Sequence, residues 1–198
     1  MKKDNNDIRY EVYRKLIHLS SLWMVCAIYF LDKKTSLSIF AFLALSIFAI
    51  ELLRKHLSSI KSIYNFLFGK ILRTHEDKGK LSGAFFVSLA AFIVTLVFSK
   101  IIAASSLAVM LISDSFAALI GKKFGSHKIL NKSIEGSLSF FISAIFVISI
   151  FYDFKVYFIG IILTALFATT TELFATKLRI DDNLTISLST AISLMILI

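Results

Sequence analysis

The chain has 198 residues, of which 57% are hydrophobic and only 18% are charged, whereas about a quarter of the residues in an ordinary soluble domain are charged. Together with a mean hydropathy of +0.81, this composition excludes a water-soluble globular protein. The single cysteine, Cys26, excludes an internal disulfide. The net charge of +9 is assigned to the connections between membrane spans, so nucleic acid is not an expected partner.

Apolar runs long enough to cross a membrane recur along the whole sequence. In chain order, the predicted spans are 16–31, 35–53, 81–99, 101–120, 134–152, 155–176 and 183–198. No internal repeat and no low-complexity linker divides them. We therefore predict an all-α fold, a polytopic helical bundle with about seven transmembrane helices that forms a single membrane domain over 1–198.

The basic residues predict how this bundle is oriented. Of the 22 Lys and Arg residues, one side of the predicted membrane carries only Lys33, Lys34, Lys100 and Lys155. Because basic residues concentrate in cytoplasmic connections, the N-terminus is predicted to be cytoplasmic. The long connections, 54–80 and 121–133, lie on that same side. We expect an integral protein of the cell membrane, or of the inner membrane of a prokaryote, with its active face toward the cytoplasm.

The longer connection contains an amphipathic segment. Apolar residues recur at helical spacing from Leu57 to Ile71, with Lys and Asn residues between them. Such a helix typically lies in the membrane interface. We predict an interfacial helix over 57–73. Just before it, Glu51 and Arg54 have the i,i+3 spacing of an ion pair at a helix end.

Two acidic residues, Asp114 and Glu172, fall inside predicted spans. An ionisable side chain at the centre of a span costs at least about 2.5 kcal/mol, so each needs a partner or a functional role. Asp114 lies roughly 10 Å from the predicted inner end of its span. The structural alternative is that each carboxylate is simply paired with a neighbouring Lys or Ser side chain.

The connection after Asp114 combines features that suit phosphate. Ser133 is a predicted N-cap, Glu135 lies in the first turn that follows, and Gly136 would let a ligand approach the backbone. A helix N-terminus with lysines beside it favours phosphate binding. The other residues predicted to surround the phosphates are Gly121, Lys122, Lys123, Gly125, His127, Lys128 and Lys132.

Further polar residues are predicted at the same face. Arg14, Lys15 and His18 fall within one helical turn, and Asp181-Asp182-Asn183 is expected to cap the last helix. The chain has no G-x-x-x-x-G-K-[ST] motif, which excludes a P-loop enzyme. Magnesium takes one or two carboxylates together with phosphate oxygens, and the candidate ligands are Asp114, Glu135 and Asp182.

These segments resemble the motifs of the family that contains dolichol kinases, phytol kinases and CTP-dependent diacylglycerol kinases. Residues 14–18 resemble its first-span motif, and residues 113–136 resemble its central signature, shared in looser form with phosphatidate cytidylyltransferases. Glu172 with 181–186 is similar to its C-terminal motif. The segment before a middle span resembles that of the family at Arg73, Glu76 and Gly83.

The resemblance implies a kinase that phosphorylates a lipid alcohol (a polyprenol, phytol or diacylglycerol), with CTP as co-substrate and Mg²⁺ as cofactor. Asp114, Glu135 and Lys132 are its expected catalytic residues. Asp114 and Glu135 are expected to hold magnesium or orient the hydroxyl. Binding of the nucleotide or the lipid substrate is expected to involve Arg14, Lys15, His18, Arg73, Glu76, Glu172 and Asn183.

Two other functions stay open at this point. One is the transfer of CMP to a lipid phosphate, as in a phosphatidate cytidylyltransferase. The other is a small transporter, with Asp114 and Glu172 on an ion pathway. Membrane lipids are expected partners in every case, and a homo-oligomer is compatible with the sequence. One residue departs from the family pattern, because Ser187 stands where members often carry proline.

Overall fold

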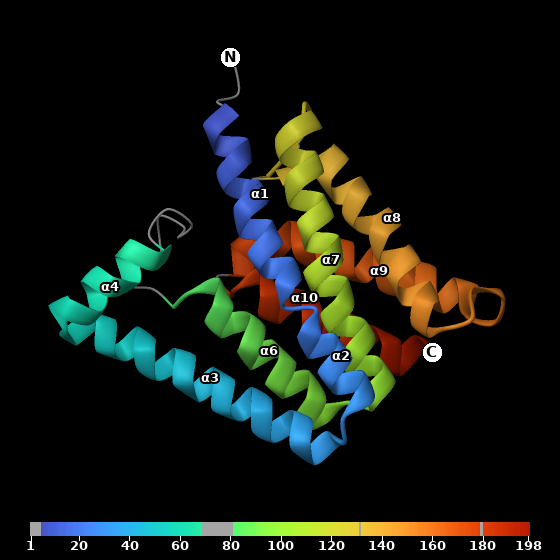
Figure 1. Ribbon diagram of the computed structural model, residues 1–198. Coiled ribbons are helices and arrows are strands. Elements are labelled where there is room, and N and C mark those ends of the chain that lie inside the picture. Colours follow the sequence, from blue (N-terminus) through green and yellow to red (C-terminus); the bar gives the residue numbers. More distant parts are fainter. Residues whose placement is uncertain (1–4, 69–80, 131, 179) are drawn as a thin grey trace.

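The computed structural model describes residues 5–68, 81–130, 132–178 and 180–198, which form a bundle of helices (Figure 1). In chain order the helices are α1 (Asn5–Ser20), α2 (Trp23–Phe30), α3 (Lys33–His56), α4 (Ser58–Phe68), α6 (Gly83–Val97), α7 (Lys100–Phe124), α8 (Ile134–Phe151), α9 (Phe154–Leu178) and α10 (Asp182–Leu197). Two short antiparallel strands, β1 (Lys128–Ile129) and β2 (Lys132–Ser133), join α7 to α8. The predicted all-α bundle is confirmed.

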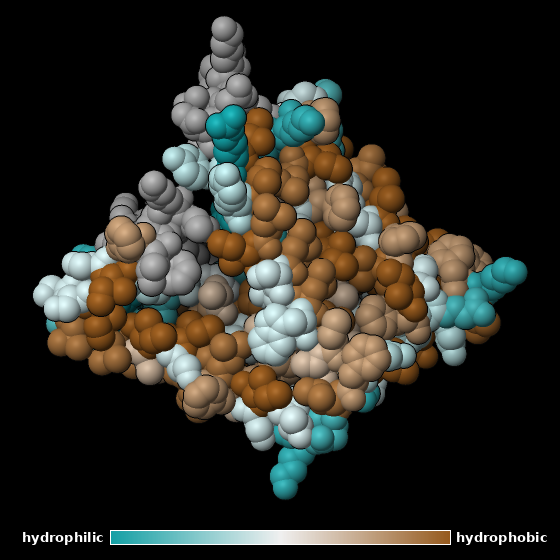
Figure 2. Space-filling model, in the orientation of Figure 1, coloured by the Kyte–Doolittle hydropathy of each residue, from teal (hydrophilic) through white to brown (hydrophobic). Residues whose placement is uncertain are grey.

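Several helices have the length and composition of membrane spans. Helices α3, α7, α8 and the part of α9 over Phe154–Ala175 are long and apolar enough to cross a membrane, and α6 and α10 are apolar but shorter. Apolar side chains cover most of the face seen in Figure 2, and hydrophilic groups gather near the start of α1 and at the α2–α3 and α8–α9 turns. The number of crossings, seven, stays a prediction.

The first predicted span, 16–31, is not one continuous helix, which corrects the prediction. Helix α1 ends at Ser20 and α2 begins at Trp23. Between them the backbone tightens, because the N–H of Met24 donates to the carbonyl of Ser21 (2.9 Å), three residues back. Helix α1 also begins at Asn5, well before the apolar run. A polar helix therefore continues into the bundle and carries charged side chains with it.

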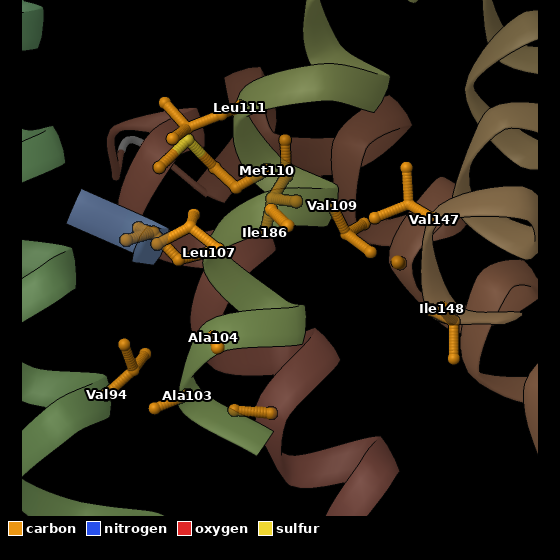
Figure 3. Close-up of a cluster of buried hydrophobic side chains, with 14 of the residues drawn as sticks. Val94, Ala103, Ala104, Leu107, Val109, Met110, Leu111, Val147, Ile148 and Ile186 are labelled. Carbon is orange, nitrogen blue, oxygen red and sulfur yellow. The ribbon is translucent and has the colours of Figure 1, made fainter. Parts of the chain in front are cut away.

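Helix α7 lies at the centre of the bundle and packs against α1, α2, α6, α8 and α10. Figure 3 shows Leu107 of α7 in a buried apolar cluster with Val94 of α6, Val147 of α8 and Ile186 of α10. Asp114 follows about two turns further along the same helix. Because α7 is enclosed on several sides, Asp114 is held inside the bundle and is only 5% exposed.

Helices α7 and α8 approach each other closely where two glycines meet. A Cβ atom on Gly136 would lie 2.8 Å from the carbonyl oxygen of Ala117 and 3.2 Å from the Cα of Gly121. A Cβ atom on Gly121 would lie 2.8 Å from Ser133 Oγ. Small residues at such crossings let membrane helices pack backbone to backbone. Close packing of the two helices thus explains why a glycine stands at position 136. The approach of a ligand to the backbone of Gly136 stays a prediction.

Replacing Gly136 by Ala is expected to force α8 away from α7. Overpacking of this kind costs about 1–3 kcal/mol, and the midpoint of thermal unfolding in detergent should fall accordingly. Leu138→Ala, on the exposed side of the same helix, is the matched control and should shift the midpoint much less. Equal midpoints for Gly136→Ala and the wild type would show that the contact between the helices is not tight.

A buried ion pair lies where α3 meets α4. The predicted pair between Glu51 and Arg54 is confirmed, with 2.5 Å between Oε2 and Nη2. The Arg54 guanidinium lies over the ring of Tyr64 in α4 (4.5 Å to its centroid), and the Tyr64 hydroxyl donates to Glu51 (3.3 Å). Burial, and next the charge of Glu51, raise the pKa of Tyr64, so that its hydroxyl stays a donor at neutral pH.

Helix α4 corresponds to part of the predicted interfacial helix over 57–73, and residues 69–73 lie outside the described residues. Ile63 and Phe66 on α4 are exposed apolar side chains. A location of α4 in the membrane interface stays a prediction.

Candidate active site

A cavity of about 310 Å³ is formed where α1, the end of α7, the β1–β2 hairpin, the start of α8, α9 and the start of α10 come together. Most of the predicted site residues line it, although they are far apart in the sequence. These are Arg14, Lys15, Asp114, Gly121, Lys122, Gly125, Lys128, Lys132, Ser133, Gly136, Glu172 and Asp182.

Asp114 is held by a cation from another helix. The ammonium group of Lys15 donates to Asp114 Oδ2, and Lys15 itself is only 2% exposed. The Nε2 atom of His18 lies 3.7 Å from the same oxygen. A buried charge without a partner is strongly destabilising, and this pairing offsets the cost of both charges. Asp114 therefore has a structural partner and also forms part of the cavity wall.

Glu172 is the second buried carboxylate of the cavity and is 3% exposed. Lys132, from strand β2, donates to Glu172 Oε1. The other oxygen, Oε2, is buried and has no hydrogen-bond partner among the residues that the structure describes. The ion pair of Lys132 and Glu172 links the hairpin to α9. It also leaves one acceptor at the cavity wall unsatisfied.

Glu11 connects two cations of the cavity. Its Oε1 accepts from Arg14 Nη2 (2.5 Å), and its Oε2 lies 3.5 Å from Lys122 Nζ at the end of α7. Glu11 is buried and joins α1 to α7 through this contact. Sequence reasoning missed it. The only available signal was its i,i+3 spacing from Arg14, because the position of Lys122 depends on how the two helices pack.

The start of α8 adds an anion-binding feature to the cavity. The prediction that Ser133 is the N-cap is confirmed, because its Oγ accepts from the N–H of Gly136 (3.1 Å). A helix N-terminus carries partial positive charge and favours anions. The lining carries more basic than acidic side chains: Arg14, Lys15, Lys122, Lys128 and Lys132 against Asp114, Glu172 and Asp182. Both features suit a polyanion.

Some predicted residues do not line the cavity. Glu135 Oε1 instead accepts from the backbone N–H groups of Ser126 (3.0 Å) and His127 (3.2 Å), so it braces the loop after α7. The predicted cap of α10 is confirmed at Asp181, which accepts from the N–H and the side-chain amide of Asn183. The predicted residues outside the lining are His18, Lys123, His127, Glu135 and Asn183; Arg73 and Glu76 lie outside the described residues.

The cavity offers the ligand type that magnesium prefers. Asp114 and Asp182 supply carboxylate oxygens, whereas no group of three or more His, Cys, Asp or Glu side chains in the described part of the chain could hold a metal ion by itself. Magnesium usually takes one or two carboxylates and completes its coordination with phosphate oxygens and water. The donors present therefore fit an ion that arrives with a phosphorylated substrate.

Comparison with known proteins gives one relative along nearly the full length. An uncharacterized protein, RP860, of Rickettsia prowazekii is 34% identical over 193 residues, which cover 94% of each chain. The chain belongs to the family of this Rickettsia protein. No family model matches the chain, and no solved structure matches it.

A second similarity is partial. CTP-dependent diacylglycerol kinase 1 of Schizosaccharomyces pombe is 31% identical over 99 residues, which cover 48% of this chain and 45% of that kinase. The similarity thus spans about half of each protein.

Ser137 is a further residue of the cavity that sequence reasoning missed. It follows Gly136 in the first turns of α8 and lines the cavity. The side chain is buried, and its Oγ has no hydrogen-bond partner within the described residues. A single serine in an apolar helix carries no signal in the sequence, because most serines in such helices bond to their own backbone.

Proposed function

We propose that the protein is a membrane-embedded kinase that transfers the γ-phosphoryl group of CTP to the hydroxyl of a lipid alcohol. The observation that carries the proposal is the cavity itself, in which basic side chains and the start of α8 lie beside buried carboxylates of membrane-type helices. Phosphoryl transfer needs little else from a protein, because its catalysis is mainly positioning and electrostatic stabilisation.

The basic residues bind the triphosphate. Lys122 and Lys128 lie at the cavity with Arg14, and together with the N-terminus of α8 they offset the charge of the phosphates. Magnesium, when bound, neutralises further charge on the phosphates, and Asp114 and Asp182 are the carboxylates that would hold it. Glu11 keeps Arg14 and Lys122 in place through its two carboxylate oxygens.

The choice of a lipid alcohol and of CTP rests on two arguments. The surrounding helices are apolar on their outer sides, so a lipid can lie against them within the bilayer. The partial similarity to a CTP-dependent diacylglycerol kinase favours the same class of reaction. The excess of basic residues on the cavity side favours a cytoplasmic location of this side.

Product analysis tests the proposal. The purified protein in lipid–detergent micelles is incubated with Mg²⁺ and with CTP or ATP labelled at the α- or γ-phosphate. Polyprenol, phytol and diacylglycerol are offered separately, and phosphatidate serves as the alternative acceptor. We expect γ-label in the lipid, CDP as the second product and no transfer with EDTA. Label from the α-phosphate in the lipid, with release of pyrophosphate, would instead identify a cytidylyltransferase.

A further inference from the structure

We infer that Glu172 binds the hydroxyl group of the acceptor alcohol and receives its proton, at a subsite that Ser137 completes. This inference rests on the proposed kinase function and adds to it the place of the second substrate. The observations that carry it are an oxygen of Glu172 and the hydroxyl of Ser137, both without a hydrogen-bond partner among the described residues, and the place of both residues in the lining of the cavity, with the groups proposed to bind the nucleotide.

The unpaired oxygen of Glu172 requires a donor. Oε2 is buried without a hydrogen-bond partner among the described residues, and a buried acceptor in this state costs about 1–3 kcal/mol. The phosphate groups of a nucleotide are acceptors and cannot satisfy it. An alcohol can, because its O–H group donates to Oε2 and its oxygen is the nucleophile of the proposed reaction.

The other acidic residues suit this role less well. Asp114 is already bound by Lys15 and lies close to His18. Glu135 does not line the cavity, and its Oε1 is occupied by the loop that follows α7. Glu172 uses only Oε1 for its ion pair with Lys132.

Glu172 also lies where a lipid can reach it. It is six residues before the end of α9 at Leu178, hence roughly 9 Å from that end of the helix. Phe167 and Phe174 of α9 and Leu138 of α8 are exposed apolar side chains on neighbouring helices. A lipid alcohol whose chain lies along these helices brings its hydroxyl, which prefers the polar boundary of the bilayer, to the depth of Glu172.

The alcohol O–H bond breaks and its proton passes to Glu172 Oε2, while the alcohol oxygen forms a bond to the γ-phosphorus. The bond between the γ-phosphorus and the bridging oxygen breaks, and its electron pair leaves with the nucleoside diphosphate. The products are the lipid phosphate, the nucleoside diphosphate and one proton, which Glu172 later releases to solvent. Ser137 Oγ orients the hydroxyl by a hydrogen bond.

The test separates binding of the nucleotide from transfer to the alcohol. With the full-length protein, CTP, Mg²⁺ and the alcohol that the wild type phosphorylates best, Glu172→Gln is expected to lower kcat at least about 100-fold and to leave the KM for CTP close to the wild-type value. Ser137→Ala is expected to raise the KM for the alcohol but not that for CTP. Thr171→Ala is the matched control, because within the described residues the Thr171 hydroxyl donates to the carbonyl oxygen of Phe167 in its own helix.

Each outcome decides between interpretations. Wild-type kcat in Glu172→Gln would overturn the assignment and leave the kinase proposal intact. A raised KM for CTP or a loss of Mg²⁺-dependent CTP binding would place Glu172 with the nucleotide instead. If Glu172→Gln does not fold, the same decision rests on Ser137→Ala, and a wild-type KM for the alcohol in that variant would overturn the subsite. A wild type that phosphorylates no alcohol would overturn the kinase proposal together with the subsite.

Discussion

Replacing Asp114 by Asn is expected to destabilise the protein and to abolish most of its activity. The substitution leaves Lys15, which is 2% exposed, without its anion. Removing one partner of a buried ion pair costs about 3–5 kcal/mol, because the remaining charge is uncompensated. Phosphoryl transfer should fall about 100- to 1,000-fold, the effect of losing one group that stabilises charge at the reacting centre. Denaturant titration in mixed micelles and the transfer assay measure the two effects separately.

The double variant Lys15→Met with Asp114→Asn distinguishes a structural from a catalytic role. With both charges removed, most of the lost stability is expected to return, since an uncharged pair often replaces a buried ion pair at little cost. Activity should not return with it, because the carboxylate at the cavity is still missing. Full turnover by Asp114→Asn, or by the double variant, would rule out a role of Asp114 in the reaction.

Hydropathy alone predicts the helices that are long and apolar enough to cross a membrane. A long apolar run is the direct requirement for crossing hydrocarbon, and α3, α7, α8 and α9 lie where such runs were found. The same criterion fails for α1, which begins at Asn5 in a polar sequence. Lys15 is buried there because of Asp114, 99 positions away. No window of sequence contains both partners, so the continuation of α1 into the bundle could not be predicted.

The residues of the candidate site were likewise only partly predictable from the sequence. Asp114 and Glu172 could be identified because a charge inside a span demands an explanation. Their partners could not, since the pairing of Glu172 with Lys132 depends on how the β1–β2 hairpin folds against α9. Glu135 shows the limit of reasoning from proximity in the sequence. Although it stands near Lys132 and Gly136, the first turn of α8 directs its carboxylate to Ser126 and His127.

Replacing Glu51 by Gln is expected to destabilise the protein, as a change at Asp114 does, but with a different functional result. Glu51 is 0% exposed and Arg54 6% exposed, so the variant removes a buried, charge-assisted hydrogen bond between them, at a cost of about 1.5–3 kcal/mol. Neither residue lines the cavity. At temperatures where the variant is folded, the KM for CTP and the kcat should therefore match those of the wild type.

Tyr64→Phe provides the graded comparison for this pair. It keeps the ring over Arg54 and removes the hydroxyl that donates to Glu51, so the expected loss is about 0.5–1.5 kcal/mol. A Glu51→Gln protein as stable as the wild type would mean that the pair of Glu51 and Arg54 contributes little to stability. A changed KM for CTP would mean that the junction of α3 and α4 communicates with the cavity. Because Glu51 and Asp114 are both buried, a difference in activity between their variants would follow from position rather than from burial, since only Asp114 lines the cavity at which the reaction is proposed to take place.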